Sequence, residues 1–415
     1  MTASMPEYWS HSTVGDACAI RNDLRLPISR EERSGMEGDY PYYGPTGVLD
    51  SIDGYRLDGT YALIGEDGDH FLDVENKPQT ILVTGKFNVN NHAHVIETTE
   101  RCSAEWFYNY FRHRSLKPYL TRQGAGRYKL NKAALQSIPI VLPPAAEQAA
   151  INRLFREWSS AIGITENLIA AKERHYSHEL SRTISRGHHP RGHVVSFAHE
   201  VSKRNHGGNA ARVLSVTNSR GFVLPEDQFV RRVASADLSN YKVVRRGQYA
   251  YNPSRINVGS IARLDGWDDG VLSPMYVVFG VDESKINSDY FLHWLDSHEA
   301  CERIRKSAQG SVRETVSFTE FAGLAIPLPD VAKQAAIALY LNALRDEIAT
   351  LGNYLEALKT QKRGLMQKLL TGQWRVKLPK SKEKSHGSLL QNSQREANFP
   401  RLEARAGGRG LPLLA

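Results

Sequence analysis

The stretch IVLPPAAEQAAI, residues 140–151, has a counterpart in IPLPDVAKQAAI, residues 326–337. The two copies stand 186 residues apart, because Leu142 aligns with Leu328 without a gap. The same offset relates further identical residues: Ile162 and Ile348, Asn167 and Asn353, Ala171 and Ala357, Gln123 and Gln309, Gly124 and Gly310, and Arg127 and Arg313. Repeats of this kind organise a whole fold, but two copies are too few for a solenoid. The sequence therefore predicts a duplicated unit, made of a globular segment followed by a long helix.

Each copy opens with Leu-Pro and then continues without proline for about forty residues, which predicts two long helices. We expect the first helix over about 145–184, and the second to end near Thr371, with Asp330 as its N-cap. At about 1.5 Å per residue, each helix is on the order of 60 Å long. That length exceeds what a globular segment of this size needs for its own core.

The second helix carries a heptad seam, because apolar residues recur at alternating steps of four and three. Lys362 fills the one gap in this seam, and the equivalent seam of the first helix is apolar early and mixed later. Packing on the helix's own segment is one interpretation; we favour a helix pair within the chain that acts as spacer and docking surface. The predicted partner-binding residues are Gln148, Ile151, Phe155, Trp158, Ile162, Gln334, Ile337, Leu341, Leu344, Ile348, Leu351, Leu355 and Leu358.

The spacer helices, residues 142–186 and 327–375, separate two globular segments. In the first, residues 1–141, short β-like runs at 61–64, 80–83 and 94–96 precede a helix at 104–111. The second, residues 187–326, is expected to have strands at 212–216, 248–251, 259–262 and 276–279 and a helix at 289–306. The basic tail, residues 376–415, has few large apolar side chains and is expected to be disordered.

Net charge gives little support for a DNA-binding body. The chain of 415 residues has a net charge of +8, but the tail alone, with eight basic and three acidic residues, contributes +5. The first globular segment, with 15 basic and 18 acidic residues, has a net charge of −3. Local patches must therefore carry any nucleic-acid interaction.

Composition also bears on the compartment. No run of about 18 apolar residues predicts a membrane span, and the first residues lack the pattern of a signal peptide. Cys18, Cys102 and Cys301 are few and far apart, which favours free thiols in a reducing cytoplasm.

Catalytic motifs are weak. The sequence has no P-loop and no glycine fingerprint for a dinucleotide or S-adenosylmethionine. Residues 252–255, Asn-Pro-Ser-Arg, resemble an amino-methyltransferase motif but lack its aromatic residue. Asp67, Glu75 and Lys77 could imitate a metal-dependent nuclease, although a solvated loop explains them better. His92 and His94 would share one strand face as a metal pair, but no third ligand is placed nearby.

Polar and basic side chains on loops remain as candidates for DNA contact. Arginine reads guanine, asparagine and glutamine read adenine, and lysine and arginine hold phosphates. The predicted DNA-binding residues are Tyr43, Asn88, Asn90, Asn91, His92, Gln123, Arg127, Lys129, Lys203, Arg204, Asn205, Asn252, Ser254, Arg255, Asn257, Gln309 and Arg313. The Gln-Gly…Arg loops at the same place in both copies could also be a shared turn that leads into each helix.

Over about residues 10–375, the sequence resembles the specificity subunit of type I restriction–modification systems. The resemblance rests on the two Leu-Pro-x-x-x-x-Gln-x-x-Ile helix openings, and on three shorter motifs. These are PYYGPTG at 41–47, KFNVNNHAHV at 86–95, and YNP at 251–253 followed by GSIA at 259–262 and SPMY at 273–276. One departure is Lys333, which stands where the first copy has Glu147.

The resemblance implies an α+β fold in which two mixed α/β target-recognition domains alternate with two long helices. These helices pack as an antiparallel coiled coil within a pseudo-twofold internal repeat. Such a chain is not an enzyme; it reads a bipartite sequence of double-stranded DNA, and binds two methyltransferase subunits and two restriction or motor subunits. S-adenosylmethionine, ATP and Mg²⁺ belong to those partners, and no cofactor is expected in this chain. The alternatives are a stand-alone nuclease and a coiled-coil scaffold that does not bind DNA.

Overall fold

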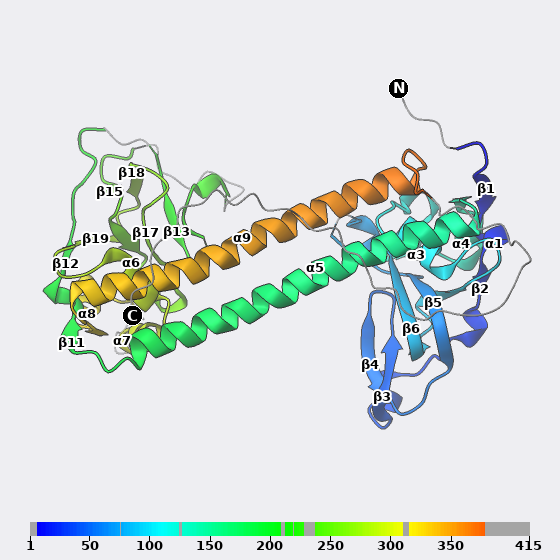
Figure 1. The fold of residues 1–415 in the computed structure, drawn as a ribbon, viewed down its shortest axis with the longest axis horizontal. Helices are drawn as coiled ribbons and strands as arrows, with labels where there is room; N and C mark the ends of the chain where they lie inside the picture. Colours follow the sequence, from blue (N-terminus) through cyan, green and yellow to red (C-terminus); the bar gives the residue numbers. More distant parts are fainter. Residues whose placement is uncertain are drawn as a thin grey trace, which may run out of the picture. The chain divides into compact units, whose positions relative to one another are not determined.

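Two long helices, α5 (Ala145–Leu180) and α9 (Val331–Leu370), lie side by side in the computed structural model (Figure 1). They run in opposite directions, because Lys362 Nζ donates to Ser159 Oγ at 2.7 Å, whereas Lys172 contacts Glu347. The structure describes residues 6–74, 76–123, 127–208, 212–218, 220–227, 237–309 and 315–377. Nearly all of the tail, residues 378–415, lies outside the described residues, and so does the prediction of its disorder.

The starts of both long helices agree with the sequence prediction. α5 begins after Pro144, and α9 begins after Asp330, whose side chain accepts a hydrogen bond from the backbone N–H of Lys333 at 2.9 Å. The first helix continues beyond Leu180 as a π-helical turn over Ser181–Ser185. Proline and the N-cap thus fix where each helix starts.

The predicted seam faces inward. Leu341 is fully buried and Leu358 is 8% exposed, although they lie more than four turns apart on α9. Polar seam residues of α5 find partners: Lys172 pairs with Glu347, and Glu179 accepts a hydrogen bond from Tyr340 at 3.2 Å. The mixed half of the α5 seam is therefore part of the contact between the helices.

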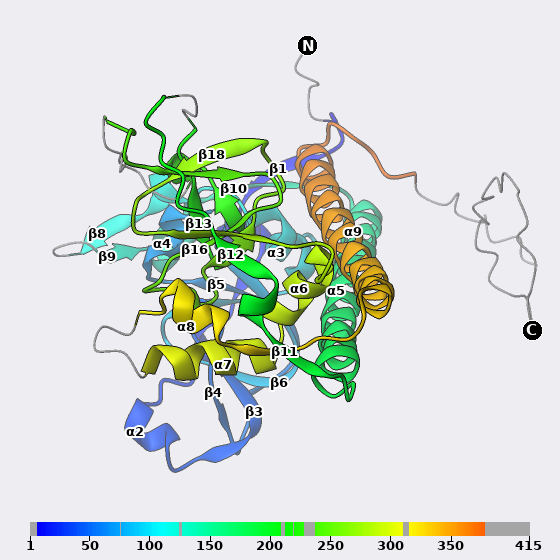
Figure 2. The ribbon, with the colours of Figure 1, turned by 90° about the vertical axis from the view of Figure 1, so that its left-hand side faces the viewer.

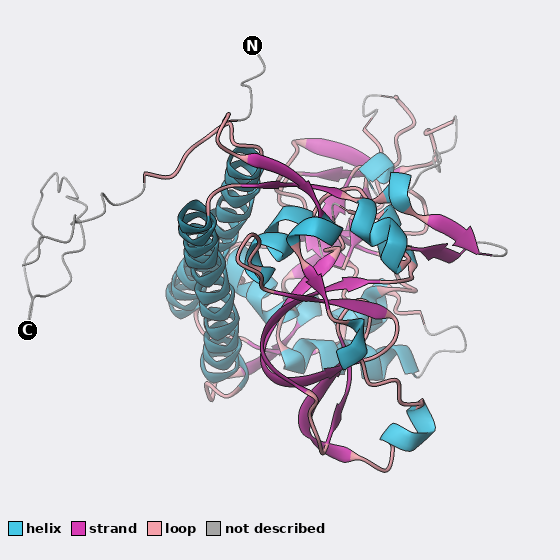
Figure 3. Ribbon diagram, turned by 90° about the vertical axis from the view of Figure 1, so that its right-hand side faces the viewer, coloured by secondary structure: helices cyan, strands magenta, loops and turns pink. Residues whose placement is uncertain are grey.

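Figure 3 shows the strands of the first globular segment in magenta. Six of them form one sheet, in the order β2-β7-β5-β6-β3-β4. Neighbouring strands are antiparallel except for β3 and β6, which are parallel. The predicted strands lie within β5, β6 and β7, and the predicted helix has the bounds of α3. The elements are β1 (Ser10–Thr13), α1 (Val14–Ala17), β2 (Ala19–Ile20), α2 (Arg30–Arg33), β3 (Glu37–Tyr43), β4 (Val48–Ile52), β5 (Leu57–Gly65), β6 (Thr80–Val89), β7 (Ala93–Glu97), α3 (Ala104–Phe111), β8 (Thr121–Gln123), β9 (Arg127–Lys129), α4 (Lys132–Ser137) and β10 (Pro139–Leu142).

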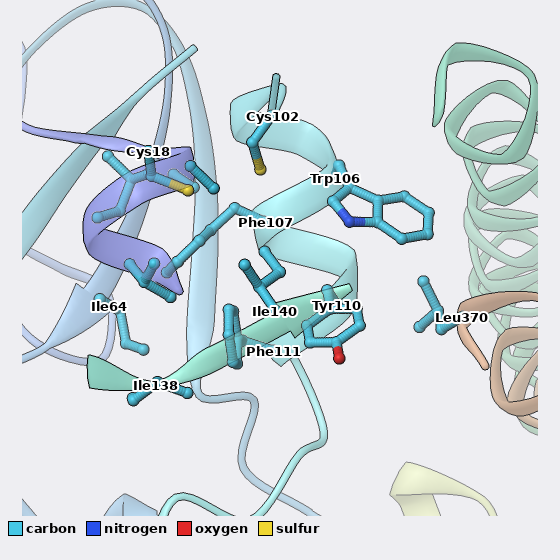
Figure 4. Close-up of a cluster of buried hydrophobic side chains, with 14 of the residues drawn as sticks. Cys18, Ile64, Cys102, Trp106, Phe107, Tyr110, Phe111, Ile138, Ile140 and Leu370 are labelled. Carbon is cyan, nitrogen blue, oxygen red and sulfur yellow. The ribbon is translucent and has the colours of Figure 1, made fainter. Parts of the chain in front are cut away.

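The core of this segment includes both long helices. Trp106 and Tyr110 of α3 lie beside Leu370 of α9 (Figure 4), and Ile151 and Phe155 of α5 belong to the same buried cluster. Burial of these large side chains stabilises the segment by about 1.5–3 kcal/mol each. The core thus fixes the start of α5 and the end of α9 to one globular segment.

Figure 4 also shows the thiols of Cys18 and Cys102 facing the same part of this core. Both are buried and free, and the neighbouring Cys18 thiol, together with burial, raises the pKa of Cys102. Cys301 is free and exposed.

The second globular segment has a four-stranded sheet, β12-β19-β16-β17, and two-stranded pairs β13-β14 and β15-β18 (Figure 2). The predicted helix over 289–306 is wrong in one respect, because Asp296 ends one helix and the Ser297 hydroxyl caps the next, accepting from Ala300 N at 3.2 Å. The elements are β11 (Arg191–His193), β12 (Ala198–Glu200), β13 (Ser215–Thr217), β14 (Gly221–Val223), β15 (Lys242–Arg245), β16 (Tyr249–Tyr251), β17 (Ile261–Arg263), β18 (Asp269–Leu272), β19 (Val277–Val281), α6 (Ser288–Leu295), α7 (His298–Gln309), α8 (Phe318–Ala322) and β20 (Ala325–Pro327).

The second core also takes in both long helices. Leu180 and Ile184, at the end of the first helix, join Ala338 and Leu341 of α9 in one buried cluster. α6 lies against α9, as α3 lies against α5 (Figure 2). Each long helix is therefore anchored in both segments.

Each segment closes with an antiparallel ribbon just before its long helix. β1 pairs with β10 in the first segment, and β11 pairs with β20 in the second. None of the helices that the structure describes is long and apolar enough to cross a membrane.

Candidate nucleic-acid interface

A polar turn follows β6 in the first segment and is held by the end of β3. Asn90 N donates to the carbonyl of Tyr43 at 2.9 Å, and the Asn90 side chain accepts from His92 N at 2.8 Å. The His92 ring lies 2.7 Å from a carboxylate oxygen of Asp67. Asn91 and His92 are exposed, so this turn presents them to solvent on a rigid base.

The β8-β9 hairpin lies against the same turn through a charged cluster. Lys129 forms a β-bridge with Asp67, and its ammonium lies 3.2 Å from Glu66. Glu66 also accepts from Arg25 at 2.7 Å. Burial opposes ionisation of Glu66, but the hydrogen bonds from Arg25 and Lys129 outweigh it and lower the pKa of the carboxyl. The cluster places the hairpin beside the Asn90–His92 turn.

The strands of this hairpin pair Gln123 with Arg127, two of the predicted DNA-binding residues. The structure describes their backbone only, so their predicted contacts fall on side chains outside the described part of the chain. Arg25, Glu66 and Asp67 were not predicted as members of this cluster. They are far apart in the sequence, and no local motif connects them.

Asn88 is a correction to the predicted set. Its side chain is fully buried and donates to the carbonyl of Gly54 at 2.7 Å. A side chain with no exposed surface cannot reach a base in this conformation, so Asn88 holds the loop before β5 instead. Tyr43 is half-buried, with its ring edge against Phe87.

In the second segment, the loop after β16 has a similar character. Asn252 is 9% exposed, and its side chain accepts from Ser254 N at 3.1 Å, while its backbone N donates to the carbonyl of Ser260. Asn252 therefore shapes the loop, and Ser254 and Arg255 are exposed on it. Asn257 is half-buried in the short 3-10 turn that follows.

This loop contacts the residues that follow the second Gln-Gly…Arg sequence. Val316 N, two residues after the part that the structure leaves out, donates to the carbonyl of Pro253 at 3.1 Å. The side chains of Gln309 and Arg313 themselves lie outside the described residues. In each segment, the structure thus brings a predicted polar turn close to described residues that flank the Gln-Gly…Arg sequence, Lys129 in the first and Val316 in the second.

Residues 203–205 occupy a separate loop. Lys203 and Arg204 are exposed, and Arg204 donates to the carbonyl of Asn240 at 2.6 Å. Asn205 is 5% exposed and packs into the fold, so its predicted base contact is corrected in the same way as that of Asn88.

The nuclease and metal hypotheses gain no support from the geometry. Asp67 is held by His92, and Glu75 is outside the described residues. His92 lies in a turn, whereas His94 is buried in β7 between Asn22 and the carbonyl of Leu130, so the two do not share a strand face. Among the described residues, no group of three or more His, Cys, Asp or Glu side chains could hold a metal ion.

The residues predicted to bind partner subunits mostly pack inside the chain. Gln148 and Gln334 are buried at the helix starts, and Ile151 and Phe155 belong to the first core. The α9 seam, from Ile337 to Leu358, faces inward along its length. The buried side chains among them hold the chain's own elements together. Trp158 and Ile162 are half-buried, and their role in partner binding stays a prediction.

Large apolar side chains are exposed elsewhere on the same helices. Ile164 is 65% exposed, and Leu168 on α5 and Tyr354 on α9 are exposed as well. Leu168 and Tyr354 fall between the Glu166–Lys359 and Lys172–Glu347 ion pairs, and Ile164 lies about one turn before Leu168 on α5. Exposed apolar groups gathered in this way mark interaction surfaces. We call Ile164, Leu168 and Tyr354 the mid-helix face.

Comparison with known proteins defines the class. A family model, the type I restriction modification DNA specificity domain, matches residues 6–173, which hold the first globular segment and most of α5. A putative type I restriction enzyme specificity subunit of Haemophilus influenzae is 36% identical over 141 residues, which is 34% of this chain and 35% of the relative. The match thus spans about a third of that relative's length.

Longer matches cover both halves. The MjaVIII type I restriction enzyme specificity subunit of Methanocaldococcus jannaschii is 21% identical over 407 residues, covering 90% of this chain and 94% of that protein. The crystal structure of the S subunit of a type I restriction-modification system from M. genitalium matches with a TM-score of 0.59 at 12% identity. That match covers 89% of this chain and 97% of the other, and supports the fold with its two long helices.

Residues 6–173 thus match a DNA specificity domain, and the solved structure supports the fold. Over most of its length, the chain is similar to the specificity (S) subunits of type I restriction-modification systems.

Proposed function

We propose that this subunit selects a bipartite sequence in double-stranded DNA, with one half read by residues 1–141 and the other by residues 187–326. The observation that carries the proposal is a shared anchor at the two helix starts. The Gln148 amide donates to the carbonyls of Pro143 and Arg101, and its oxygen accepts from Ser103 N.

Gln334 makes the corresponding contacts in the second half. Its amide donates to the carbonyls of Pro329 and Lys285, and its oxygen accepts from Asn287 N at 2.7 Å. Ser103 and Asn287 are the N-caps of α3 and α6. The matching anchors support two recognition domains related by a pseudo-twofold axis, each with the same attachment to its helix.

In this proposal, α5 and α9 form an antiparallel coiled coil that sets the spacing of the two half-sites. Both cores include an end of each long helix, which supports a stiff connection. Fixed separation between two reading domains imposes a fixed spacing on DNA, as in dimeric DNA-binding proteins.

The exposed members of the predicted set would make the DNA contacts, and the buried amides would shape the loops. Exposed or half-buried candidates are Tyr43, Asn91, His92, Lys129, Lys203, Arg204, Ser254, Arg255 and Asn257. Gln123, Arg127, Gln309 and Arg313 stay as proposed contacts on the adjoining loops.

We propose that the mid-helix face binds methyltransferase subunits, two per complex, and that two restriction or motor subunits join them. S-adenosylmethionine, ATP and Mg²⁺ would then reside on these partners, in the cytoplasm. The free cysteines are consistent with that compartment.

Domain exchange tests the proposal. Residues 191–325 are replaced by the equivalent segment of another S subunit, and methylated adenines are mapped by sequencing host DNA. We expect one half-site to change and the other half and the spacing to stay. A change in both halves, or in neither, would contradict division of the site between the segments.

A second experiment tests the spacing. Four residues inserted near Ala357 lengthen α9 by about 6 Å. We expect the distance between half-sites to change or recognition to be lost, whereas an unchanged sequence would refute the spacer role.

A further inference from the structure

A basic cavity of about 830 Å³ lies between the end of α3 and the two long helices. Among the residues that line it, Glu166 supplies the one carboxylate, and Lys359 Nζ lies 3.1 Å from that carboxylate. The basic side chains in the lining are Arg112, Arg114, Lys359, Lys362 and Arg363. The cavity therefore holds more positive charge than its own residues balance.

Arg112 and Lys362 show this imbalance directly. The Nε of Arg112 is buried and has no hydrogen-bond partner among the described residues. Lys362 donates to the uncharged hydroxyl of Ser159. Burial and the nearby charge of Arg112 lower the pKa of Lys362 to about 8. A buried N–H without an acceptor is costly, and so are two neighbouring half-buried cations, unless an anion is present.

The second half of the chain has an equivalent site in which the charges are balanced. Arg112 is the C-cap of α3, and Asp296 is the C-cap of α6. The repeat offset of 186 residues relates Ser159 to Arg345. Asp296 and Arg345 form an ion pair, and no such pair exists between Arg112 and Ser159.

The third position completes the comparison. The same offset relates Tyr176 to Lys362, and the Arg345 guanidinium lies 5.7 Å from the Tyr176 ring. The second half thus contains an acid, a base and an aromatic ring. Among the described residues, the first half has Arg112, Ser159 and Lys362 at these three positions, which are two cations and no anion. Lys362 also interrupts the apolar seam of α9. This interruption is the feature of the sequence that indicates the site.

We propose that the cavity around Arg112 and Lys362 binds a phosphate group. The planar guanidinium can hold two phosphate oxygens, and the ammonium adds a point charge. The group could come from a DNA phosphodiester or from a free nucleotide, since both offer the same oxyanion. The inference goes beyond the proposed function, because phosphate binding here is independent of which bases are read.

Thermal unfolding of the full-length chain tests the proposal with inorganic phosphate as the probe. A ligand that binds the folded state raises the midpoint, and chloride at equal ionic strength serves as reference. We expect phosphate to raise the wild-type midpoint and to have no such effect on Arg112→Gln or Lys362→Gln. The matched control is Lys172→Gln, a cation on α5 outside the cavity lining, which should respond as wild type. The absence of a phosphate-specific shift in wild type, or an equal shift in all variants, would overturn the proposal.

A transplant provides an independent check if the single variants fold poorly. Arg112→Asp, Ser159→Arg and Lys362→Tyr together reproduce the arrangement of the second half. This triple variant should fold at least as well as wild type and lose the response to phosphate. A wild-type response in the triple variant would also refute the site.

The source of the phosphate is read from two further measurements. If DNA supplies the phosphate, Arg112→Gln makes binding of duplex DNA less dependent on salt. The slope of log K against the logarithm of the salt concentration becomes shallower by about 1. If a nucleotide supplies it, the slope is unchanged and the midpoint shift caused by ADP is lost. If Arg112→Gln alters only assembly with partner subunits, the cavity takes an acidic protein side chain, and the phosphate proposal fails.

Discussion

Glu147, in the first turn of α5, accepts a hydrogen bond from Arg375, which follows the end of α9. The Arg375 Nε–Glu147 Oε1 distance is 3.2 Å, and the other carboxylate oxygen accepts from Trp9 and Tyr8 at 3.1 and 3.0 Å. Glu147 is 1% exposed. One buried carboxylate thus joins the N-terminal segment, the start of α5 and the end of α9. The equivalent Lys333 is exposed in α9 and has no such role.

Reversal of this charge tests the joint. We expect Glu147→Lys to lower the free energy of unfolding by about 3–5 kcal/mol, because it buries an unpaired cation beside Arg375. Lys333→Glu, the matched change in the second copy, should stay within about 0.5 kcal/mol, since its side chain is exposed. Urea denaturation followed by tryptophan fluorescence measures both. A similar loss in the two variants would contradict the asymmetry.

The glutamines at the helix starts give a symmetric prediction. Gln148→Ala and Gln334→Ala each leave a buried backbone N–H and buried carbonyls without partners, at a cost of about 2–4 kcal/mol. Gln361→Ala, on the exposed face of α9, is the control. Hydrogen exchange should accelerate at the amide of Ser103 in the first variant and at that of Asn287 in the second. If either variant loosened both amides equally, the two anchors would not act separately.

The sequence predicted the elements that depend on local signals. Leu-Pro, Asp330 and the leucine spacing define the long helices, and the aromatic face around Trp106 defines α3. The seam also predicted which side of α9 is buried, because the spacing of its apolar residues matches the period of an α-helix. Ser297 was missed because a serine that caps a helix looks the same in sequence as a serine within one.

Long-range contacts could not be predicted. The Gln148 side chain bonds the Arg101 carbonyl and the Ser103 N–H, more than forty residues earlier, and the Asn88 amide donates to the Gly54 carbonyl in the loop between β4 and β5. The seam pattern could not distinguish a helix partner in the same chain from one in another subunit. The sequence around Arg112 did not indicate a binding site, because the equivalence of Arg112 and Asp296 is visible only in the structure.

The inward orientation of the seam has a direct test. Leu358→Ala should lower the free energy of unfolding by about 2–5 kcal/mol, because it opens a cavity between α5 and α9. Leu339→Ala, at a position 74% exposed on the same helix, should change it by less than about 0.5 kcal/mol. Equal effects in urea denaturation would mean that α9 is rotated relative to the described packing.

Buried histidine makes stability depend on pH. Burial lowers the pKa of His94, although its hydrogen bond to the Leu130 carbonyl and the charge of Glu66 oppose this shift, and Arg25 and Lys129 reinforce it. Below about pH 6.5, the unfolded chain binds a proton that the folded chain binds less readily, so stability falls as pH falls.

The His94→Gln variant should show a smaller loss of stability between pH 7 and pH 5.5 than wild type, by up to about 1 kcal/mol. His178→Gln, at an exposed position on α5, serves as the control and should retain the wild-type slope. A steeper decline in His94→Gln would show that the ring is protonated in the folded state.

The mid-helix face makes the proposed assembly testable without reference to DNA. Ile164→Glu and Tyr354→Glu place carboxylates where an apolar partner surface would have to cover them, and an unpaired buried charge costs several kcal/mol. We therefore expect at least a hundredfold weaker association with the methyltransferase subunit, measured by titration of purified components. The unfolding midpoint of the isolated chain should stay unchanged, because both side chains are exposed. Val195→Glu makes the same kind of change at an exposed apolar position of the second segment, and should leave association intact. If Val195→Glu weakened association as strongly, or if the two helix variants bound as wild type, the partner would dock elsewhere.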